Sequence, residues 1–192
     1  MSQDNEPNND LTGKLLIAMP SMGDPRFAQS VVFLCAHSAE GTMGLVINRP
    51  TDDLRLHHLL DQLSIEVGEG ARDRPVHHGG PVEHGRGFVL HDSGYKSDLS
   101  TLAVSADFGM TATLDILEAL ACGNGPEHAL VALGYAGWGP GQLDAEIAQN
   151  GWLTCEASHD LVFDTRDSGK WEAALARLGI SALTLSADAG RA

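Results

Sequence analysis

The chain has 192 residues, of which 43% are apolar and 20% are charged, and its formal net charge is −14. This length suits one domain that can bury a core of its own. The composition excludes a wholly disordered chain, a collagen-like fibre and a membrane-embedded protein. The negative charge repels polyanions, and no Lys or Arg stands between Lys96 and Arg166. We therefore expect no direct binding to nucleic acid and no association with membranes.

The ends of the chain and its cysteines indicate a cytoplasmic protein. Cys35, Cys122 and Cys155 are widely spaced and odd in number, which is typical neither of a disulfide framework nor of a zinc ribbon. The first ten residues lack the positive and apolar regions of a signal peptide. We expect frayed tails at residues 1–10 and 187–192, on either side of one folded domain at residues 11–186.

The first third of the chain predicts three strands and a helix. The strands are short apolar runs bounded by Gly, Pro or Ser, at residues 14–19, 31–36 and 43–48. The turn at residues 38–41 predicts a hairpin between the second and third of them. The spacing of leucines then becomes helical, which predicts a surface helix at residues 52–63 with Thr51 as its cap.

The rest of the chain changes repeatedly between strand-like and helix-like patterns. Strands are predicted at residues 75–78, 88–91, 101–105, 129–135, 152–156 and 180–185. Helices are predicted at residues 113–121 and 142–149 and, after a Ser168 cap, along the apolar stripe of Trp171, Ala174, Leu175 and Leu178. Because strands outnumber helices and do not alternate strictly with them, the pattern predicts a single α+β domain with a mixed sheet.

The sequence carries no recognisable catalytic or metal-binding motif. G-x-S-x-G, GK[ST] and H-E-x-x-H are all absent, and adjacent histidines point apart on a strand or a helix. Two alternatives remain open: His37, His78, His84 and His91 could converge from different strands, and Cys35 with His37 could form a thiolate and its base. Ordinary buried or surface side chains explain the same residues. We expect no bound metal and no cofactor.

Two glycine loops suggest a ligand site. Residues 137–141 follow an apolar strand and open a helix, where free backbone N–H groups favour an anionic or carbonyl oxygen. The loop departs from the dinucleotide-binding fingerprint, because Gln142 stands where the third glycine is needed. We predict one shared cleft with Arg49 as its only permanent cation, lined by Asn48, Arg49, Gly79, Gly80, Gly137, Trp138 and Gln142. Arg72 and Arg74 alternate with acidic residues and are interpreted as part of a solvated surface.

Four blocks of sequence follow one another in a distinctive order. They are GKLLIAMPSMGDPRFAQSVVFLCAHSAEGTMGLVINRP, HHGGPVE, FVLH and GYAGWGPGQLDAEIAQNGWL. In this order the chain resembles the YqgE/AlgH family of bacterial proteins from about Leu11 to Leu185. The matching positions are His37, Gly44, Asn48, Arg49, Pro50, Gly79, Gly80, Pro81, His91, Gly137, Trp138, Gln142, Leu143 and Glu146. The resemblance implies a mixed, bifurcated sheet that curls into a pseudo-barrel flanked by helices.

The resemblance implies little about function. The family is largely uncharacterised, so what it implies is an indirect role in transcriptional regulation through binding of a protein or a small ligand, and it assigns no catalytic residue. The alternative is a hydrolase or a metal-dependent enzyme built from His37, Asn48, His91 and Glu146. We favour the non-enzymatic interpretation because the sequence carries no catalytic signature.

Overall fold

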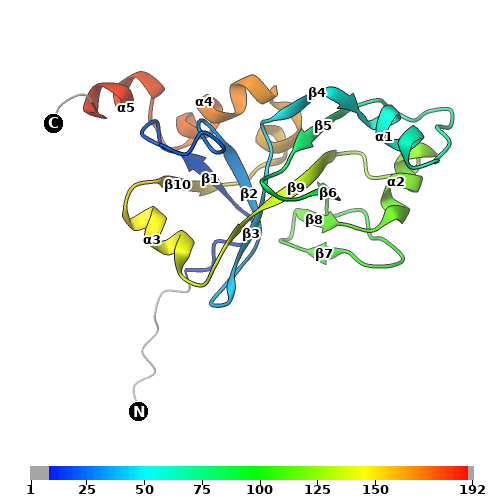
Figure 1. Cartoon of the computed structure of the whole chain (residues 1–192), viewed down its shortest axis with the longest axis horizontal. Coiled ribbons are helices and arrows are strands. Elements are labelled where there is room, and N and C mark those ends of the chain that lie inside the picture. Colours follow the sequence, from blue (N-terminus) through cyan, green and yellow to red (C-terminus); the bar gives the residue numbers. More distant parts are fainter. Residues whose placement is uncertain (1–8, 190–192) are drawn as a thin grey trace, which may run out of the picture.

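The computed structural model describes residues 9–189, with side chains as far as residue 185. The strands β10, β1, β2, β3, β9, β6, β8 and β7 are neighbours in that order, while β5 pairs with both β4 and β9 (Figure 1). The strands are β1 (Lys14–Ala18), β2 (Val31–Ser38), β3 (Gly41–Val46), β4 (Pro50–Arg55), β5 (Pro75–His78), β6 (Val82–Asp92), β7 (Leu102–Ala103), β8 (Phe108–Thr111), β9 (Ala129–Trp138) and β10 (Trp152–Glu156). The helices are α1 (Leu56–Gln62), α2 (Leu114–Ala121), α3 (Gln142–Ala148), α4 (Asp167–Arg177) and α5 (Ala182–Ala189), with a π-helical turn η1 (Asp160–Asp164).

The central strands are buried on both of their faces. In β1, Leu15 and Ile17 join the apolar cluster on one side of the sheet, while Leu16 and Ala18 join the cluster on the other. All four side chains are fully buried. A strand covered on both faces has a continuous apolar sequence rather than an alternating one. This is why the run at the start of the chain identifies β1 correctly.

The sheet forks at β9. One edge of this strand pairs with β6, whereas the other edge pairs first with β5 and then, from Ala136 onward, with β3. The backbones at Gly80 and Gly134, both at positive φ, lie in close contact at the fork. A Cβ atom on Gly80 would lie 2.1 Å from the carbonyl carbon of Tyr135, and one on Gly134 would lie 2.6 Å from the oxygen of Gly80. Glycine is needed at both positions because no side chain fits between these backbones.

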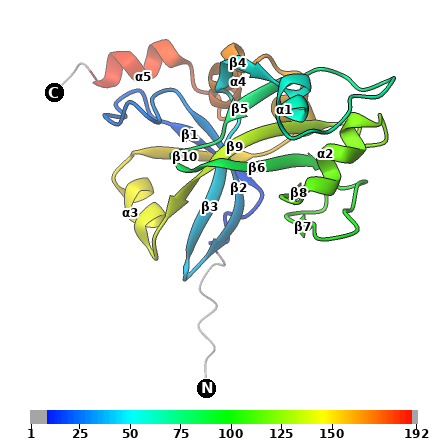
Figure 2. The ribbon, with the colours of Figure 1, turned by 45° about the vertical axis from the view of Figure 1, so that its right-hand side comes forward.

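Helices cover the sheet in three separate patches (Figures 1 and 2). On one face, η1 and α4 pack through Leu161 and Trp171. On the opposite face, α3 packs through Leu143. Beyond the fork, α1 and α2 pack on β5, β6 and β9 through Leu60 and Ile116. The first and third patches come close to each other near β5, and a cavity with polar side chains lies there.

The predicted helix at 52–63 is wrong in its first half. Residues Pro50–Arg55 form β4, and α1 begins only at Leu56. The Thr51 hydroxyl, predicted to cap a helix, instead donates to backbone oxygens of residues 54 and 76. The backbone N–H of Leu56 donates to the oxygen of Arg74. Pairing with a strand twenty residues away thus overrides the local helical spacing, which is a common outcome when propensities are weak.

The C-terminal expectations also need correction. Residues 180–185, predicted as a strand, enter helix α5, and the Ser181 hydroxyl accepts a hydrogen bond from the Thr184 N–H as a helix cap does. Ser168 lies within α4, whose cap residue is Arg166. Only Leu102–Ala103 of the predicted strand at 101–105 is paired. The strand β8 and the turn η1 were not predicted.

The predicted hairpin at residues 38–41 is confirmed, because Ser38 and Gly41 face each other as the last pair of β2 and β3. The fold class is confirmed as well: one α+β domain whose curled, mostly antiparallel sheet forms a half-barrel with a few helices. Within residues 9–189, no helix combines the length and the apolar character that crossing a bilayer requires. Much of the two predicted tails, residues 1–8 and 190–192, lies outside the described residues.

Candidate functional site

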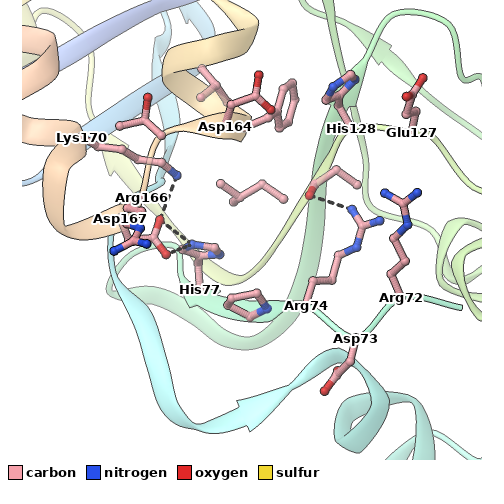
Figure 3. A pocket seen from close by; sticks show the side chains of 16 residues that line it. Arg72, Asp73, Arg74, His77, Glu127, His128, Asp164, Arg166, Asp167 and Lys170 are labelled. Atoms are coloured by element: carbon pink, nitrogen blue, oxygen red, sulfur yellow. Dashed lines mark hydrogen bonds and ion pairs between the residues drawn. The ribbon is translucent and has the colours of Figure 1, made fainter.

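A cavity of about 490 Å³ opens where η1 and α4 meet the starts of β5 and β9. Three stretches of chain line it: residues 72–75 with His77, residues 127–130, and residues 162–167 with Lys170. We call it the lysine pocket. Lys170, Asp167 and His77 stand along one side of it, and Arg72, Arg74 and His128 stand on the other (Figure 3). Its volume falls in the range that proteins use to hold small ligands.

A chain of hydrogen bonds fixes the first side of the lysine pocket. The Lys170 ammonium donates to Asp167 Oδ1 at 2.9 Å and to the backbone oxygen of Ile47 at 2.7 Å, although the residue is only 2% exposed. His77 Nε2 lies 3.0 Å from both carboxylate oxygens of Asp167, and its Nδ1 lies 3.3 Å from the oxygen of Val131. Each ring nitrogen of His77 thus faces an acceptor, which holds the imidazole in one orientation.

Two residues of this chain of hydrogen bonds are close in sequence, and the third is distant. Asp167 and Lys170 are three residues apart at the start of α4, so their side chains lie on the same face of the helix. His77 comes from β5, ninety residues earlier. The strand and the helix are brought together only by the packing of α4 on the sheet.

Burial and hydrogen bonding have opposite effects on the pKa values of Asp167 and Lys170. Burial would raise the pKa of Asp167, but the hydrogen bonds from His77 and Lys170 outweigh it and hold that pKa below its ordinary value. Burial lowers the pKa of Lys170, despite the opposing effect of Asp167. A buried ammonium keeps its charge most readily beside an ionised carboxylate, so the two groups depend on each other.

The opposite side of the pocket carries two arginines. Arg74 is half-buried and donates from Nη1 to the oxygen of Ala129 at 3.0 Å. Arg72 is exposed at the rim. The lining of the pocket also includes the apolar residues Pro75, Leu130 and Val162. Such an arrangement can orient a small molecule that has polar groups at both ends.

The residues of the predicted cleft are distributed over three places. Gly137, Trp138 and Gln142 line a second cavity of about 350 Å³. Gly79 and Gly80 are buried at the fork of the sheet. Asn48 and Arg49 bind the segment before β2 and do not line that cavity.

The side chains of Asn48 and Arg49 hold the 26–31 segment through its backbone. Asn48 Oδ1 accepts from the N–H of Val31 at 3.0 Å, and its Nδ2 donates to the oxygen of Gln29 at 2.9 Å. Arg49 donates to the oxygens of Arg26 and Ala28 at 2.5 and 2.6 Å. Arg26 itself lines the second cavity, so Arg49 holds the backbone of a lining residue without lining the cavity itself. Ligand binding by these residues stays a prediction.

The residues of the enzyme alternative have separate partners. His37 Nδ1 lies 2.8 Å from the Thr42 hydroxyl, and His91 Nε2 lies 2.9 Å from the Thr111 hydroxyl. Glu146 Oε2 accepts hydrogen bonds from the indole N–H groups of Trp138 and Trp152.

The cysteine and histidine alternatives can be placed in the same way. Burial raises the pKa of the Cys35 thiol to about 12, which disfavours a thiolate. His78 stacks on His84, with ring centroids 5.4 Å apart. Residues 9–185 contain no group of three or more His, Cys, Asp or Glu side chains placed to hold a metal ion.

Comparison with known proteins identifies the family. The AlgH-like family model matches residues 15–183. UPF0301 proteins of Cereibacter sphaeroides and Ruegeria pomeroyi are 60% and 61% identical to this chain, over 95% of its length and 100% of theirs. The chain belongs to the AlgH-like family. The solution structure of the AlgH protein from Pseudomonas aeruginosa is 44% identical, covers 100% of both chains and superposes with a TM-score of 0.78. These likenesses establish the family and the fold and assign no activity.

Sequence reasoning missed the lysine pocket, although α4 contained a signal. Lys170 stands four residues before Ala174 and next to Trp171, on the stripe that packs against the sheet. A lysine on the apolar face of an amphipathic helix needs an anionic partner, and Asp167, three residues earlier, is the nearest acidic residue at helical spacing. The sequence around His77 gives no sign that this residue contacts Asp167, which is ninety residues away.

Proposed function

We propose that this protein is a non-enzymatic binding protein whose small ligand occupies the lysine pocket. The observation that supports this most is the prearranged chain of Lys170, Asp167 and His77 beside a cavity of ligand size. The groups are already hydrogen-bonded to one another, so a ligand finds them in fixed positions and binding needs little ordering. The Lys170 amine is engaged with two acceptors and buried, which favours a binding role over a nucleophilic one.

We further propose that any effect on transcription passes through a partner protein. The formal charge of −14 and the long stretch without cations after Lys96 both oppose contact with DNA phosphates. Fluorescence anisotropy with labelled duplex DNA near 150 mM salt should show no binding tighter than about 10⁻⁶ M. Sub-micromolar binding with a steep salt dependence would contradict the proposal.

The ligand site can be tested by nuclear magnetic resonance on ¹⁵N-labelled protein, titrated with a panel of small polar metabolites. A binding compound should shift the backbone amides of residues 72–77, 127–130 and 162–170, which line the lysine pocket. Shifts confined to residues 137–142 would favour the predicted cleft instead. Absence of shifts in the lysine pocket for every compound would refute the proposed function.

A further inference from the structure

The arginines of the lysine pocket are placed as a pair. Arg72 and Arg74 are two residues apart in the segment that leads into β5, and both line the lysine pocket. Both guanidinium groups point up from that segment toward the level of His128 (Figure 3). Burial and the neighbouring charge of Arg72 lower the pKa of Arg74, so the two cations are close enough to repel each other.

Neither arginine of this pair has an ion-pair partner among residues 9–185. Within the described residues, no carboxylate oxygen forms an ion pair within 4.0 Å of either guanidinium. Asp73, which stands between the two arginines, points away from the cavity (Figure 3). Its carboxylate accepts hydrogen bonds from Arg55 Nε at 2.8 Å and from the N–H of His57 at 3.0 Å. Glu127 lines the same side of the pocket but forms no ion pair with either arginine. In a chain with 26 Asp and Glu and 12 Lys and Arg, these two adjacent cations are therefore open to an external anion.

We propose that Arg72 and Arg74 bind the phosphoryl group of a small phosphate monoester, whose remaining part extends along the apolar lining of the pocket toward Lys170 and His77. This inference rests on the proposed function of the same pocket. A phosphate monoester carries a charge of about −1.5 to −2 at neutral pH, which matches two guanidinium groups. The fork of N–H donors on each arginine also fits phosphate oxygens. Arg74 uses one N–H on Ala129 and keeps four for a ligand.

The test compares matched pairs of compounds that differ only in the phosphoryl group. AMP with adenosine, ribose 5-phosphate with ribose, and inorganic phosphate alone would be titrated into the full chain by calorimetry and by the amide-shift measurement above. At least one phosphorylated compound should bind at least about tenfold more tightly than its partner, as expected for a charge-assisted bidentate contact. Its shifts should include residues 72–74.

Variants separate this contact from general charge effects. Arg72→Gln removes an exposed side chain and should leave the fold intact, while weakening the phosphorylated compound about tenfold and leaving its dephosphorylated partner unchanged. Arg74→Gln should act in the same direction. Arg86→Gln makes the same change in net charge outside the lysine pocket and serves as the control, with binding unaltered.

Several results would overturn the inference. Equal affinity for every phosphorylated compound and its partner, an unaltered affinity in Arg72→Gln, or an equal loss in Arg86→Gln would each do so. If a compound without phosphate shifts the pocket amides while phosphate monoesters do not, the phosphoryl assignment fails and the proposed function stands. If no compound shifts them, both fail.

Discussion

Asp167 and Glu146 each bridge two hydrogen-bond donors, but the donors differ in charge. Asp167 lies between the ammonium of Lys170 and the imidazole of His77. Glu146 Oε2 lies between the indole N–H groups of Trp138 and Trp152, at 2.8 and 3.0 Å. The first carboxylate stands at the edge of the lysine pocket, and the second ties α3 to the end of β9 and the start of β10.

The difference in donors predicts a difference in what each site requires. A buried ammonium needs an anion, because the cost of removing a charge from water is offset only by an opposite charge nearby. A buried indole N–H needs only an acceptor, and a neutral acceptor is sufficient. Asp167 therefore depends on its charge and Glu146 on its oxygen, and isosteric amide substitutions distinguish these requirements.

The largest effect is expected for Asp167→Asn. The amide keeps the shape of the side chain but leaves Lys170 buried without a counter-charge, so the free energy of unfolding should fall by about 3 kcal/mol, as when one partner of a buried ion pair is removed. Urea denaturation measures the loss. Adding Lys170→Met to this variant should return most of it, because the unpaired charge is then gone. A loss below about 1 kcal/mol would show that Asp167 serves only as an acceptor.

The difference between wild type and Asp167→Asn should depend on pH. The pKa of Asp167 is lower in the folded protein than in the unfolded chain, so its contribution is fully present above about pH 4 and is lost as pH falls through the folded value. Urea denaturation of both proteins between pH 2.5 and 7, each series taken at about one-unit steps, should show their stabilities converging at the acid end. A gap that stays constant would contradict the charge requirement.

A smaller loss is expected for Glu146→Ala. Two indole N–H groups lose their acceptor while Trp138 and Trp152 remain nearly buried, at 6% and 2% exposure. An unsatisfied buried donor costs about 1 kcal/mol or more, so the free energy of unfolding should fall by about 2 kcal/mol. Tryptophan fluorescence during urea denaturation reports both the loss and any change around the rings. An unchanged stability would show that water replaces the carboxylate.

The smallest effect is expected for Glu146→Gln. A glutamine can place its carbonyl oxygen where Glu146 Oε2 now accepts both indole hydrogen bonds, so stability should change by less than about 1 kcal/mol. The same urea measurement tests this. Should Glu146→Gln cost as much as Asp167→Asn, the two sites would not differ in their need for charge, and the comparison would fail.

The sequence by itself determined the local elements of this fold. The hairpin between β2 and β3 was predicted because its turn and both strands are adjacent in the chain, and the central strands were predicted because burial on both faces leaves a continuous apolar run. The blocks of sequence that resemble one family also identified that family correctly.

Tertiary structure decided the elements and contacts that depend on distant partners. The start of the predicted 52–63 helix became β4 because β5 offered backbone hydrogen bonds that no local pattern reveals. The helical start of α4 is enough to place Asp167 beside Lys170. His77 is ninety residues from Asp167 in sequence, and Ile47 is 123 residues from Lys170, so only the packing of α4 on the sheet brings these partners into contact. The periodicity of a sequence predicts which face of an element is apolar. It does not predict which elements pack together, and that packing decides which groups lie next to a buried charge.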